Sequence, residues 1–359
     1  MTARTAGPVL IVGSGLLGAS IGHALRALDV DVALEDSSPS TLDLAIDYGA
    51  GRRAESDEKP ALVVVAVPPD QLAAVIGAAL VRFPDALVTD VGSVKVSPLA
   101  ELVENGAPIE RYLGSHPLAG RERGGAISAR ADIFLGRPWV ITPHAQTTSA
   151  QIHAIEALVL DVGAAPVQLS PEEHDHSVAL ISHVPQLVAS LMAARLVDAP
   201  SAAVAIAGQG VRDVTRVAAS SPELWVQILT ANAAQVGPVL SAIRDDLATL
   251  EAAIVAHGAP GARRTIAELL RSGNTGVARL PGKHGGDARF AQLVVLIDDR
   301  PGQIAKLLTE VGELGVNLED LRLEHSPGAQ IGIVELSIVP EARDRLEEEL
   351  TTRGWRIAG

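Results

Sequence analysis

Short apolar runs punctuate the first half of the chain, and small or polar residues separate them. The runs richest in Val, Ile and Leu occupy residues 8–12, 30–36, 61–67, 86–90 and 139–142. Stretches with apolar residues at helical spacing lie between several of these runs. Strands that alternate with helices form a parallel sheet covered on both faces. We therefore predict a doubly wound α/β domain over residues 1–168.

The pattern changes at Ser170 and becomes helical. Ser170 can cap a helix, the following proline suits the first helical position, and Glu173 completes a capping box. Residues 172–271 are rich in Ala and Leu and contain few strand candidates. Five glycines and one proline in residues 272–286 predict a linker. We predict an all-α domain over residues 169–280.

The last part of the chain, residues 289–359, returns to a mixed pattern. Strands are predicted at residues 290–297, 317–323 and 331–339, and helices at residues 302–314 and 341–352. The order β-α-β-β-α-β in a segment of this length is typical of the ferredoxin-like fold. We predict a separate, small α+β domain.

The composition narrows the classes of function. A net charge of −14 argues against a nucleic-acid partner, because phosphate binding needs clustered Lys and Arg. The lack of cysteine excludes disulfides, thiolate nucleophiles and Cys-ligated metals, and it suits the reducing cytoplasm. The longest uninterrupted apolar run, residues 61–67, is far shorter than the ~20 residues that span a bilayer. We expect a cytoplasmic protein with no membrane partner.

Three glycines with the spacing G-x-G-x-x-G follow the first predicted strand and open a helix. Gly13 permits a tight turn, Gly15 lets a diphosphate approach the backbone, and Gly18 allows helix and strand to pack closely. Asp36, at the end of the second strand, can accept hydrogen bonds from the adenosine ribose and would repel the 2′-phosphate of NADP. The pattern predicts a Rossmann-type NAD site. The alternative is a structural glycine turn followed by surface acids.

Two candidate residues lie where further strands end or loops begin. Ser93 follows the strand at residues 86–90 and can orient an imidazole or a substrate hydroxyl, but a serine there is also a common helix cap. His116 lies in a predicted loop rich in Gly and Pro, and histidine is the natural proton acceptor near neutral pH. His116 is therefore a candidate general base, with a pKa near ~6.5 if unperturbed. A structural histidine would fit the same pattern.

Charged clusters in the helical segment each allow two interpretations. Residues 172–176, Glu-Glu-His-Asp-His, and His183 contain metal-ligand residue types, but the two histidines of 172–176 point in different directions on a helix and match no zinc spacing. We predict no metal site and a solvated first helical turn, with one helix face near the cleft. Arg212 and Arg216, four residues apart, could hold a carboxylate or form a surface salt-bridge network.

In combination, these motifs resemble the prephenate/arogenate dehydrogenase family across nearly the whole chain. The resemblance rests on GSGLLG, VTDVGSVK, GSHPLAGRERGG, LSPEEHDHSVALISHVPQ and GVRDVTRVAASSPELW, in this order. It implies an NAD-binding Rossmann domain and an all-helical domain that forms an intertwined homodimer, with the active site between these domains. It also implies NAD contacts from Gly13, Gly15, Leu16, Leu17, Gly18, Asp36 and Val67.

The resemblance implies roles for individual residues. His116 matches the histidine that hydrogen-bonds the ring C4 hydroxyl and takes its proton as hydride leaves for the nicotinamide. Ser93 matches the serine that orients this histidine, and Arg216 matches the arginine that binds a substrate carboxylate. Glu122 and Arg212 match polar positions around the substrate mouth.

The resemblance leaves two substrates, prephenate and L-arogenate. After the Ser182-His183-Val-Pro segment some prephenate-specific members carry a histidine, where this chain has Gln186. Gln186 and His183 are expected on the substrate side, so the choice between a keto group and an ammonium group stays open, and we favour prephenate. The alternatives are another Rossmann-plus-helical dehydrogenase, such as a 3-hydroxyacid dehydrogenase, and an amino-acid sensor without turnover.

The C-terminal segment resembles an ACT domain, a small amino-acid-sensing module. The resemblance rests on the strings IDDRPG and LGVN. The residues expected to hold an effector are Asp299, Pro301, Gly302, Gly315 and Asn317. L-Tyrosine is the hypothesised effector, and the alternative is a dimerisation module that binds no ligand.

Overall fold

The computed structural model describes residues 2–120, 125–280, 290–325 and 331–358. The chain divides into two compact units. The first contains Met1–Ala199 and Val214–Ile243, and the second contains Pro200–Asp213 and Arg244–Gly359.

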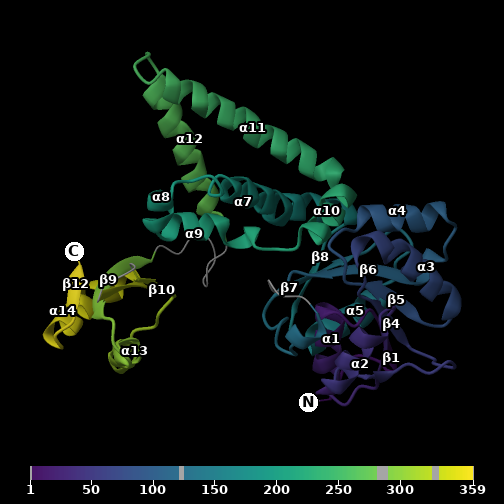
Figure 1. Ribbon diagram of the computed structural model, residues 1–359. Coiled ribbons are helices and arrows are strands. Elements are labelled where there is room, and N and C mark those ends of the chain that lie inside the picture. Colours follow the sequence, from purple (N-terminus) through teal and green to yellow (C-terminus); the bar gives the residue numbers. More distant parts are fainter. Residues whose placement is uncertain (1, 121–124, 281–289, 326–330, 359) are drawn as a thin grey trace. The chain divides into compact units, whose positions relative to one another are not determined.

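The first unit is built on an eight-stranded sheet in the order β3-β2-β1-β4-β5-β6-β7-β8 (Figure 1). Its strands are β1 (Val9–Val12), β2 (Val32–Glu35), β3 (Arg52–Arg53), β4 (Leu62–Val65), β5 (Leu87–Asp90), β6 (Tyr112–Pro117), β7 (Pro138–Thr142) and β8 (Ala165–Gln168). The order is that of a Rossmann-type doubly wound sheet, which confirms the predicted fold class of this region. The predicted parallel arrangement is confirmed for the strand pairs of this sheet except β6 and β7, which are antiparallel. Antiparallel neighbours need no helical crossover between them.

Helices cover both faces of this sheet. They are α1 (Leu16–Arg26), α2 (Pro39–Asp47), α3 (Leu72–Arg82), α4 (Val96–Glu104) and α5 (Ser149–Asp161). Alternate residues of β1 enter different cores: Val9 and Ile11 pack in one cluster with α1, α2 and α5, and Leu10 packs in the other with α3 and α4. This two-sided burial explains why the strands read as continuous apolar runs rather than as alternating ones.

The helical part of the first unit begins at the predicted cap, Ser170. Its elements are α6 (Pro171–Val178), a π-helical turn η4 (Ala179–His183), α7 (Val184–Ala194), a 3₁₀ turn η5 (Arg216–Ala218), α10 (Pro222–Ala231) and the start of α11 (Ala233–Val255). Ser170 accepts a hydrogen bond from the amide of Glu173, whose side chain bonds the Ser170 amide in return. The predicted capping box is therefore confirmed.

Among the described helices, the continuous stretch Pro171–Ala194 is long and apolar enough to cross a bilayer by length and composition, and α10 with α11 qualifies only as a pair bent by 98°. The first stretch carries buried polar side chains, His174, Asp175 and His183. A helix in a protein core passes the same test of length and composition. Buried polar side chains of such a helix form hydrogen bonds with neighbouring elements.

The second unit contains the remaining helices and a separate sheet. Its helices before residue 280 are α8 (Ser201–Ala205), α9 (Gln209–Thr215) up to Asp213, α11 from Arg244, and α12 (Ala262–Val277). The prediction of a linker from residue 272 was wrong at its start, because α12 continues to Val277. Gly273 and Gly276 lie within α12. An exposed helical glycine costs about 1 kcal/mol relative to alanine and does not by itself end a helix.

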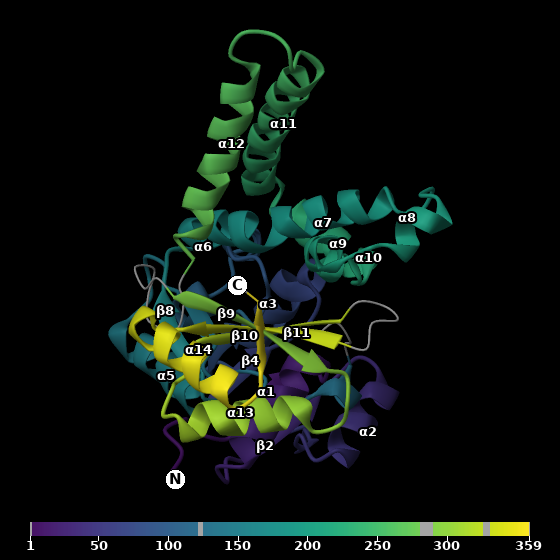
Figure 2. The same cartoon turned by 90° about the vertical axis from the view of Figure 1, so that its left-hand side faces the viewer.

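The C-terminal sheet is antiparallel, in the order β10-β11-β9-β12. Figure 2 shows this sheet with the two helices of its domain. Its elements are β9 (Ala291–Asp298), α13 (Gln303–Glu313), β10 (Asp320–His325), β11 (Ile331–Ile338), α14 (Arg343–Thr352) and β12 (Arg356–Ala358). Alternate residues of β9, Leu293, Val295 and Ile297, share one core with Leu307 of α13 and Leu346 of α14, so both helices lie on one face. The predicted β-α-β-β-α-β order is confirmed.

Candidate functional site

The glycine turn between β1 and α1 is shaped by close backbone contacts. A Cβ atom on Gly13, whose φ is +101°, would lie 2.4 Å from the carbonyl oxygen of Ala66, and one on Gly18 would lie 1.9 Å from that of Gly13. A Cβ on Gly15 would meet nothing within 4 Å. Gly13 and Gly18 are thus required for the fold of the turn, whereas Gly15 leaves space that a diphosphate can use.

Asp36 links this turn to the end of β2. Its carboxylate accepts the amide hydrogens of Ser14, at 2.7 Å, and of Ser38, at 2.8 Å. A carboxylate has about four lone-pair positions, so hydrogen bonds from ribose hydroxyls remain possible. Glu35 is instead held by Arg82 at 2.8 Å.

A cavity of about 680 Å³ lies beside the turn. Four of the seven predicted NAD-contacting residues line it: Gly13, Gly15, Asp36 and Val67. The lining does not include Leu16, Leu17 or Gly18, which lie on α1. The volume is within the range of small-molecule sites, and the open side of Gly15 and the acid at the end of β2 suit the diphosphate and ribose of a dinucleotide.

His116 lies on strand β6, so its prediction as a loop residue was wrong. Gly and Pro suggested a loop, but Gly114 pairs with both neighbouring strands, and a Cβ there would lie 2.7 Å from Thr142 Oγ1. Pro117 is the last residue of the strand. Because β6 is parallel to β5 and β5 to β4, His116 lies at the same carboxyl edge of the sheet as Gly13.

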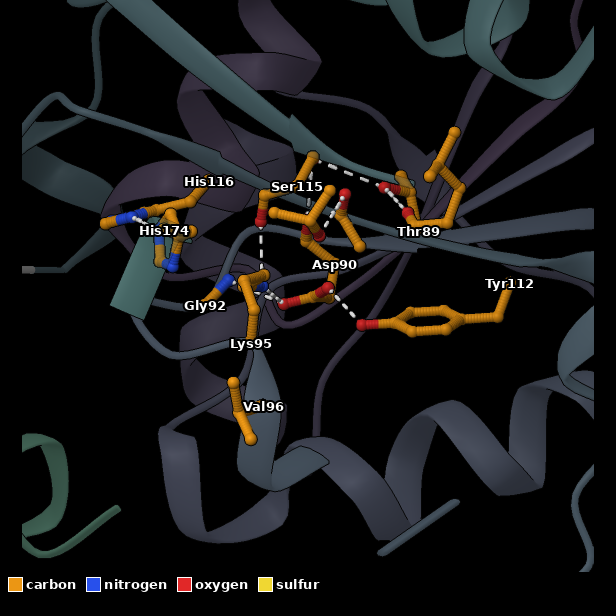
Figure 3. Close-up of polar contacts among 12 residues, drawn as sticks. Thr89, Asp90, Gly92, Lys95, Val96, Tyr112, Ser115, His116 and His174 are labelled. Carbon is orange, nitrogen blue, oxygen red and sulfur yellow. Dashed lines mark hydrogen bonds and ion pairs between the residues drawn. The ribbon is translucent and has the colours of Figure 1, made fainter. Parts of the chain in front are cut away.

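A buried ion pair supports the strand under His116. Lys95, which is 1% exposed, pairs with the fully buried Asp90 and donates to the carbonyl oxygen of Ser115 at 2.8 Å (Figure 3). Asp90 also accepts the hydroxyl hydrogen of Tyr112 at 2.8 Å. Burying two charges is costly unless their remaining hydrogen-bonding positions are satisfied, and these contacts satisfy most of them. The backbone immediately before His116 is therefore fixed from below.

The imidazole of His116 contacts a second histidine. His116 Nδ1 lies 2.9 Å from His174 Nε2, and His174 Nδ1 lies 2.7 Å from Asp175 Oδ1 (Figure 3 shows the two rings). Burial is the largest cause that lowers the pKa of His116 well below its usual value, and the neighbouring charges of His174 and Lys95 act in the same direction. Burial also lowers the pKa of His174. Both rings are therefore neutral at pH 7, and His116 can accept a proton.

Asp175 also caps helix α4, a role for which the sequence offered Ser93. The N-cap position of α4 is Lys95, whose side chain makes no capping bond, and Asp175 accepts the amide hydrogens of Lys95 and Val96 at 2.8 and 2.9 Å. The interpretation of Ser93 as this cap was wrong, because the helix begins three residues later. Ser93 is half-buried, and in the described part of the chain no hydrogen bond joins it to His116.

The acidic segment at the start of α6 is only partly solvated. Glu172, Glu173 and His176 are exposed as predicted, but His174 and Asp175 are buried. A signal for this was present in the sequence: the buried positions 171, 174, 175, 178 and 179 have the spacing of one helix face. No group of three or more His, Cys, Asp or Glu side chains within the described ranges could hold a metal ion.

A second buried histidine lies close by. Asn232 Nδ2 donates to the carbonyl oxygen of Asp175 at 2.8 Å and lies 3.1 Å from His183 Nδ1. Because a carbonyl only accepts, Asn232 presents its NH₂ group there, so His183 Nδ1 accepts and Nε2 carries the proton. Burial lowers the pKa of His183 to about 4. The ring of Trp225 contacts His183 edge-on, with centroids 6.0 Å apart.

The other residues predicted to contact substrate, as far as the structure describes them, form no hydrogen bond with His116 or His174. Gln186 is buried and donates to Ser220 Oγ at 2.8 Å. Arg216 is exposed at the start of η5 in the first unit, and Arg212 is exposed on α9 in the second unit. In the part of the chain that the structure describes, neither guanidinium has an ion-pair partner, so the alternative of a salt-bridge network has no support there. Glu122 lies outside the described residues.

The predicted effector residues lie in two loops of the C-terminal sheet domain. Gly302 and Gly315 have positive φ, +87° and +68°, which glycine adopts without strain. Gly315 and Asn317 line a cavity of about 440 Å³ together with Glu341 and Arg345. The lining of this cavity does not include the loop residues Asp299, Pro301 and Gly302, which are exposed.

Two family models match consecutive parts of the chain. "Prephenate dehydrogenase, nucleotide-binding domain" matches residues 21–168, and "Prephenate dehydrogenase, dimerization domain" matches residues 170–270. Among curated proteins, the probable prephenate dehydrogenase NovF of Streptomyces niveus is 37% identical over 96% of this chain and 98% of its own. The cyclohexadienyl dehydrogenase of Zymomonas mobilis is 34% identical over 69% of this chain and 89% of its own.

Solved structures give the same grouping. Prephenate dehydrogenase from Aquifex aeolicus, crystallised with hydroxyphenyl propionate and NAD⁺, is 27% identical with a TM-score of 0.69, over 77% of this chain and 99% of its own. Arogenate dehydrogenase from Synechocystis is 26% identical with a TM-score of 0.62, over 75% of this chain and 98% of its own.

Proposed function

The chain belongs to the prephenate dehydrogenase family, and we propose from this premise that it catalyses the NAD-dependent oxidative decarboxylation of prephenate to 4-hydroxyphenylpyruvate, in tyrosine biosynthesis. One observation carries the proposal. A neutral histidine, His116, lies at the same sheet edge as the glycine turn, and its Nε2 has no hydrogen-bond partner among the described residues. A free basic nitrogen beside a hydride acceptor is what oxidation of an alcohol requires.

The proposed reaction needs no covalent bond between the protein and the substrate. His116 Nε2 takes the proton of the ring C4 hydroxyl while the C4–H bond pair departs as hydride. NAD supplies the hydride acceptor when bound. The bond pair of the departing carboxylate enters the ring, CO₂ leaves, and the proton returns to the phenolate oxygen of the aromatic product. Positioning of the reactants and proton transfer are therefore the main contributions of the protein.

The proposed cofactor residues divide by function. Gly15 leaves room for the diphosphate at the N-terminus of α1, and Asp36 accepts hydrogen bonds from the adenosine ribose. Val67 lines the same cavity. We assign Gly13 and Gly18 to the shape of the turn, and Leu16 and Leu17 to backbone contacts at the helix start.

A direct assay tests the main proposal. Purified protein with prephenate and NAD should show rising absorbance of the reduced nicotinamide and release of CO₂, whereas a 3-hydroxyacid in place of prephenate should give no signal. Turnover of the hydroxyacid without turnover of prephenate would reject the proposed reaction in favour of another dehydrogenase of similar architecture.

Arogenate is the second candidate substrate, and Gln186 is the observation that favours it. Its side-chain amide is bonded to Ser220, in a position where some prephenate-specific relatives carry a histidine. The Synechocystis relative of solved structure is an arogenate dehydrogenase. Comparison of kcat/KM for the two substrates, in the native chain and in Gln186→His, tests the role of this position. We expect the histidine variant to shift the ratio toward prephenate.

Arg216 is proposed to bind a substrate carboxylate, with Arg212, Glu122 and His183 as further substrate-side residues. Its guanidinium is exposed and has no ion-pair partner among the described residues, so it is available for a ligand. A hydrogen bond to a charged group contributes about 1.5–3 kcal/mol. We therefore expect Arg216→Ala to raise KM for prephenate roughly 10- to 100-fold. The Kd for NAD should not change. A collapse of NAD affinity instead would assign this arginine to the cofactor.

We further propose three functional domains, with boundaries at residues 1–168, 169–280 and 289–359, and a cytoplasmic homodimer formed through the helical domain. The match to a dimerisation-domain model over residues 170–270 supports the dimer. Exposed apolar side chains on its helices, such as Leu191, Val204 and Leu247, support it as well. Sedimentation of the purified chain at micromolar concentration should give twice the monomer mass.

The C-terminal domain is proposed to be an ACT domain that binds L-tyrosine. The β-α-β-β-α-β order, the two glycines with positive φ and the cavity beside Asn317 support this. A ligand with different affinities for two states of an enzyme shifts its activity, typically by ~1–3 kcal/mol of coupling. A chain ending at Gly286 should remain active and lose inhibition by tyrosine at saturating prephenate. Unchanged competitive inhibition of the shortened chain would place tyrosine in the catalytic site instead.

A further inference from the structure

His116 is the outer end of a chain of three side chains. The inner members, His174 and Asp175, are 0% and 2% exposed, and the two contacts between the three groups measure 2.9 and 2.7 Å. The imidazole rings of His116 and His174 meet edge to face, with centroids 5.1 Å apart and planes at 74°. Each ring therefore directs one nitrogen at the next group in the chain.

The inner end of this chain is fixed as an acceptor. Asp175 accepts the amide hydrogen of Lys95 at Oδ1 and that of Val96 at Oδ2, and its Oδ1 also lies 2.7 Å from His174 Nδ1. These amides form the N-terminus of α4, where the helix dipole stabilises negative charge. A carboxyl group whose two oxygens both accept from amides at a helix N-terminus is present as the carboxylate, which can only accept.

The proton positions then follow from one end to the other. His174 must donate from Nδ1 to the carboxylate, and burial lowers its pKa, so the neutral ring has only a lone pair on Nε2. His116 must therefore donate from Nδ1 to that lone pair. The remaining lone pair of neutral His116 lies on Nε2, the nitrogen that the proposed reaction uses as the base. A free neutral histidine would exchange between its two tautomers.

Residues outside this group of three side chains also hold His174 in place, through its neighbour Asp175. Asn232, between α10 and α11, donates to the carbonyl oxygen of Asp175, and the N-terminus of α4 donates to its carboxylate, so groups from outside α6 fix Asp175. Among the described residues, His174 is the hydrogen-bond partner that the structure gives His116 Nδ1. The neighbouring histidine on α6, His176, is exposed and its Nδ1 lies 3.3 Å from Gln235 Oε1. It provides a matched control.

We propose that His174 is a positioning residue that accepts the Nδ1–H of His116 and so keeps the basic lone pair on Nε2, with Asp175 fixing the tautomer of His174 in turn. This inference rests on the proposed role of His116 as the general base. The arrangement has the same logic as an acid that orients a catalytic histidine through its second nitrogen, but here a histidine stands between the acid and the base.

Two substitutions separate this role from simple packing. His174→Phe keeps a ring of similar size and removes the acceptor, and His174→Gln places an amide oxygen near the former Nε2 position. We expect His174→Phe to lower kcat roughly 10- to 100-fold, the usual effect of losing such an orienting partner, with KM for prephenate and Kd for NAD within about threefold of native. His174→Gln should recover most of the lost kcat. His176→Phe should match the native enzyme.

The tautomer itself is measured in the full-length protein labelled with ¹⁵N-histidine, with the His116 signals assigned by their loss in His116→Asn. We expect the Nδ1–H form in the native chain and in His174→Gln, and a substantial share of the Nε2–H form in His174→Phe. Retention of the Nδ1–H form in His174→Phe would overturn the inference, as would equal loss of kcat in the Phe and Gln variants. Failure of the proposed role of His116 gives a different result, full activity of His116→Asn whatever the tautomer, and failure of the proposed reaction gives a native chain that does not turn over prephenate.

Discussion

The glycine turn and the histidine chain lie at one edge of one sheet, but different parts of the sequence hold them. The turn is formed by residues 13–18, fixed by backbone contacts and by Asp36. The hydrogen-bonded side chains of His116, His174 and Asp175 join β6 to α6. The N-terminus of α4 and Asn232 support them. The turn is defined by its own glycine spacing, with contacts to Asp36 and Ala66 that are 22 and 53 positions away, whereas the histidine region exists only through contacts between residues 57 to 80 positions apart. Their responses to substitution should differ accordingly.

The largest expected effect belongs to the histidine region. His116→Asn removes the proton acceptor and should lower kcat by ~10²- to 10⁴-fold, with a smaller change in KM. Isothermal titration should show unchanged NAD affinity, because the glycine turn does not depend on His116. Loss of NAD binding in this variant would mean that the two regions are not independent.

Within the turn, two glycines provide a matched pair. Gly18→Ala forces a Cβ to within 1.9 Å of the Gly13 carbonyl oxygen and should lower the free energy of unfolding by about 1–3 kcal/mol in urea titrations. Gly15→Ala meets no protein atom within 4 Å and should leave unfolding unchanged. It should instead weaken NAD binding about tenfold or more, because the added methyl occupies the proposed diphosphate position. Equal NAD affinity in Gly15→Ala and the native chain would place the diphosphate elsewhere.

A smaller effect is expected from Asp36→Ala. The native chain should prefer NAD, because a carboxylate at this position repels the 2′-phosphate of NADP. The substitution should narrow the ratio of kcat/KM for NAD over NADP about tenfold. Some loss with NAD is also expected, since Asp36 holds the Ser14 amide of the turn. Native activity that is equal with both cofactors would show that the acid does not face the ribose.

The smallest expected effect is that of pH on kcat/KM of the native chain between pH 8 and 6.5. Only neutral His116 accepts a proton, and burial lowers its pKa well below the usual 6.5. The logarithm of kcat/KM should therefore stay flat as the pH falls from 8 through 6.5, and it should decline only at lower pH. A half-maximal point at or above 6.5, which disappears in His116→Asn, would contradict the burial of this imidazole.

The difference between the two regions also explains which predictions from the sequence succeeded. The sequence signals for the glycine turn, the Rossmann-type sheet and the capping box at Ser170 each lie in a few neighbouring residues, and the structure contains all three. His116 was found as a candidate, but as part of a loop, because Gly114 and Pro117 are common in loops. Pairing with β5 and β7 outweighs that local preference.

The residues that the sequence did not identify are those whose partners are distant. Lys95 was noted only as the end of a motif, yet it forms the buried pair with Asp90. His174 and Asp175 were assigned to a solvated turn, because Glu172, Glu173 and His176 around them are polar. The spacing of the buried positions on α6 favoured a buried face, but it did not say what that face contacts.

The sequence by itself determined the order of the elements, the nucleotide-binding turn and the candidate base, since hydrophobic periodicity, glycine spacing and residue type act over a few neighbouring positions. Only the tertiary structure decided the state of that base. Burial sets whether His116 is charged, and the partner at 2.9 Å sets which nitrogen carries its proton. Both depend on desolvation and hydrogen bonding between α6, α4 and β6, and no local pattern encodes those contacts.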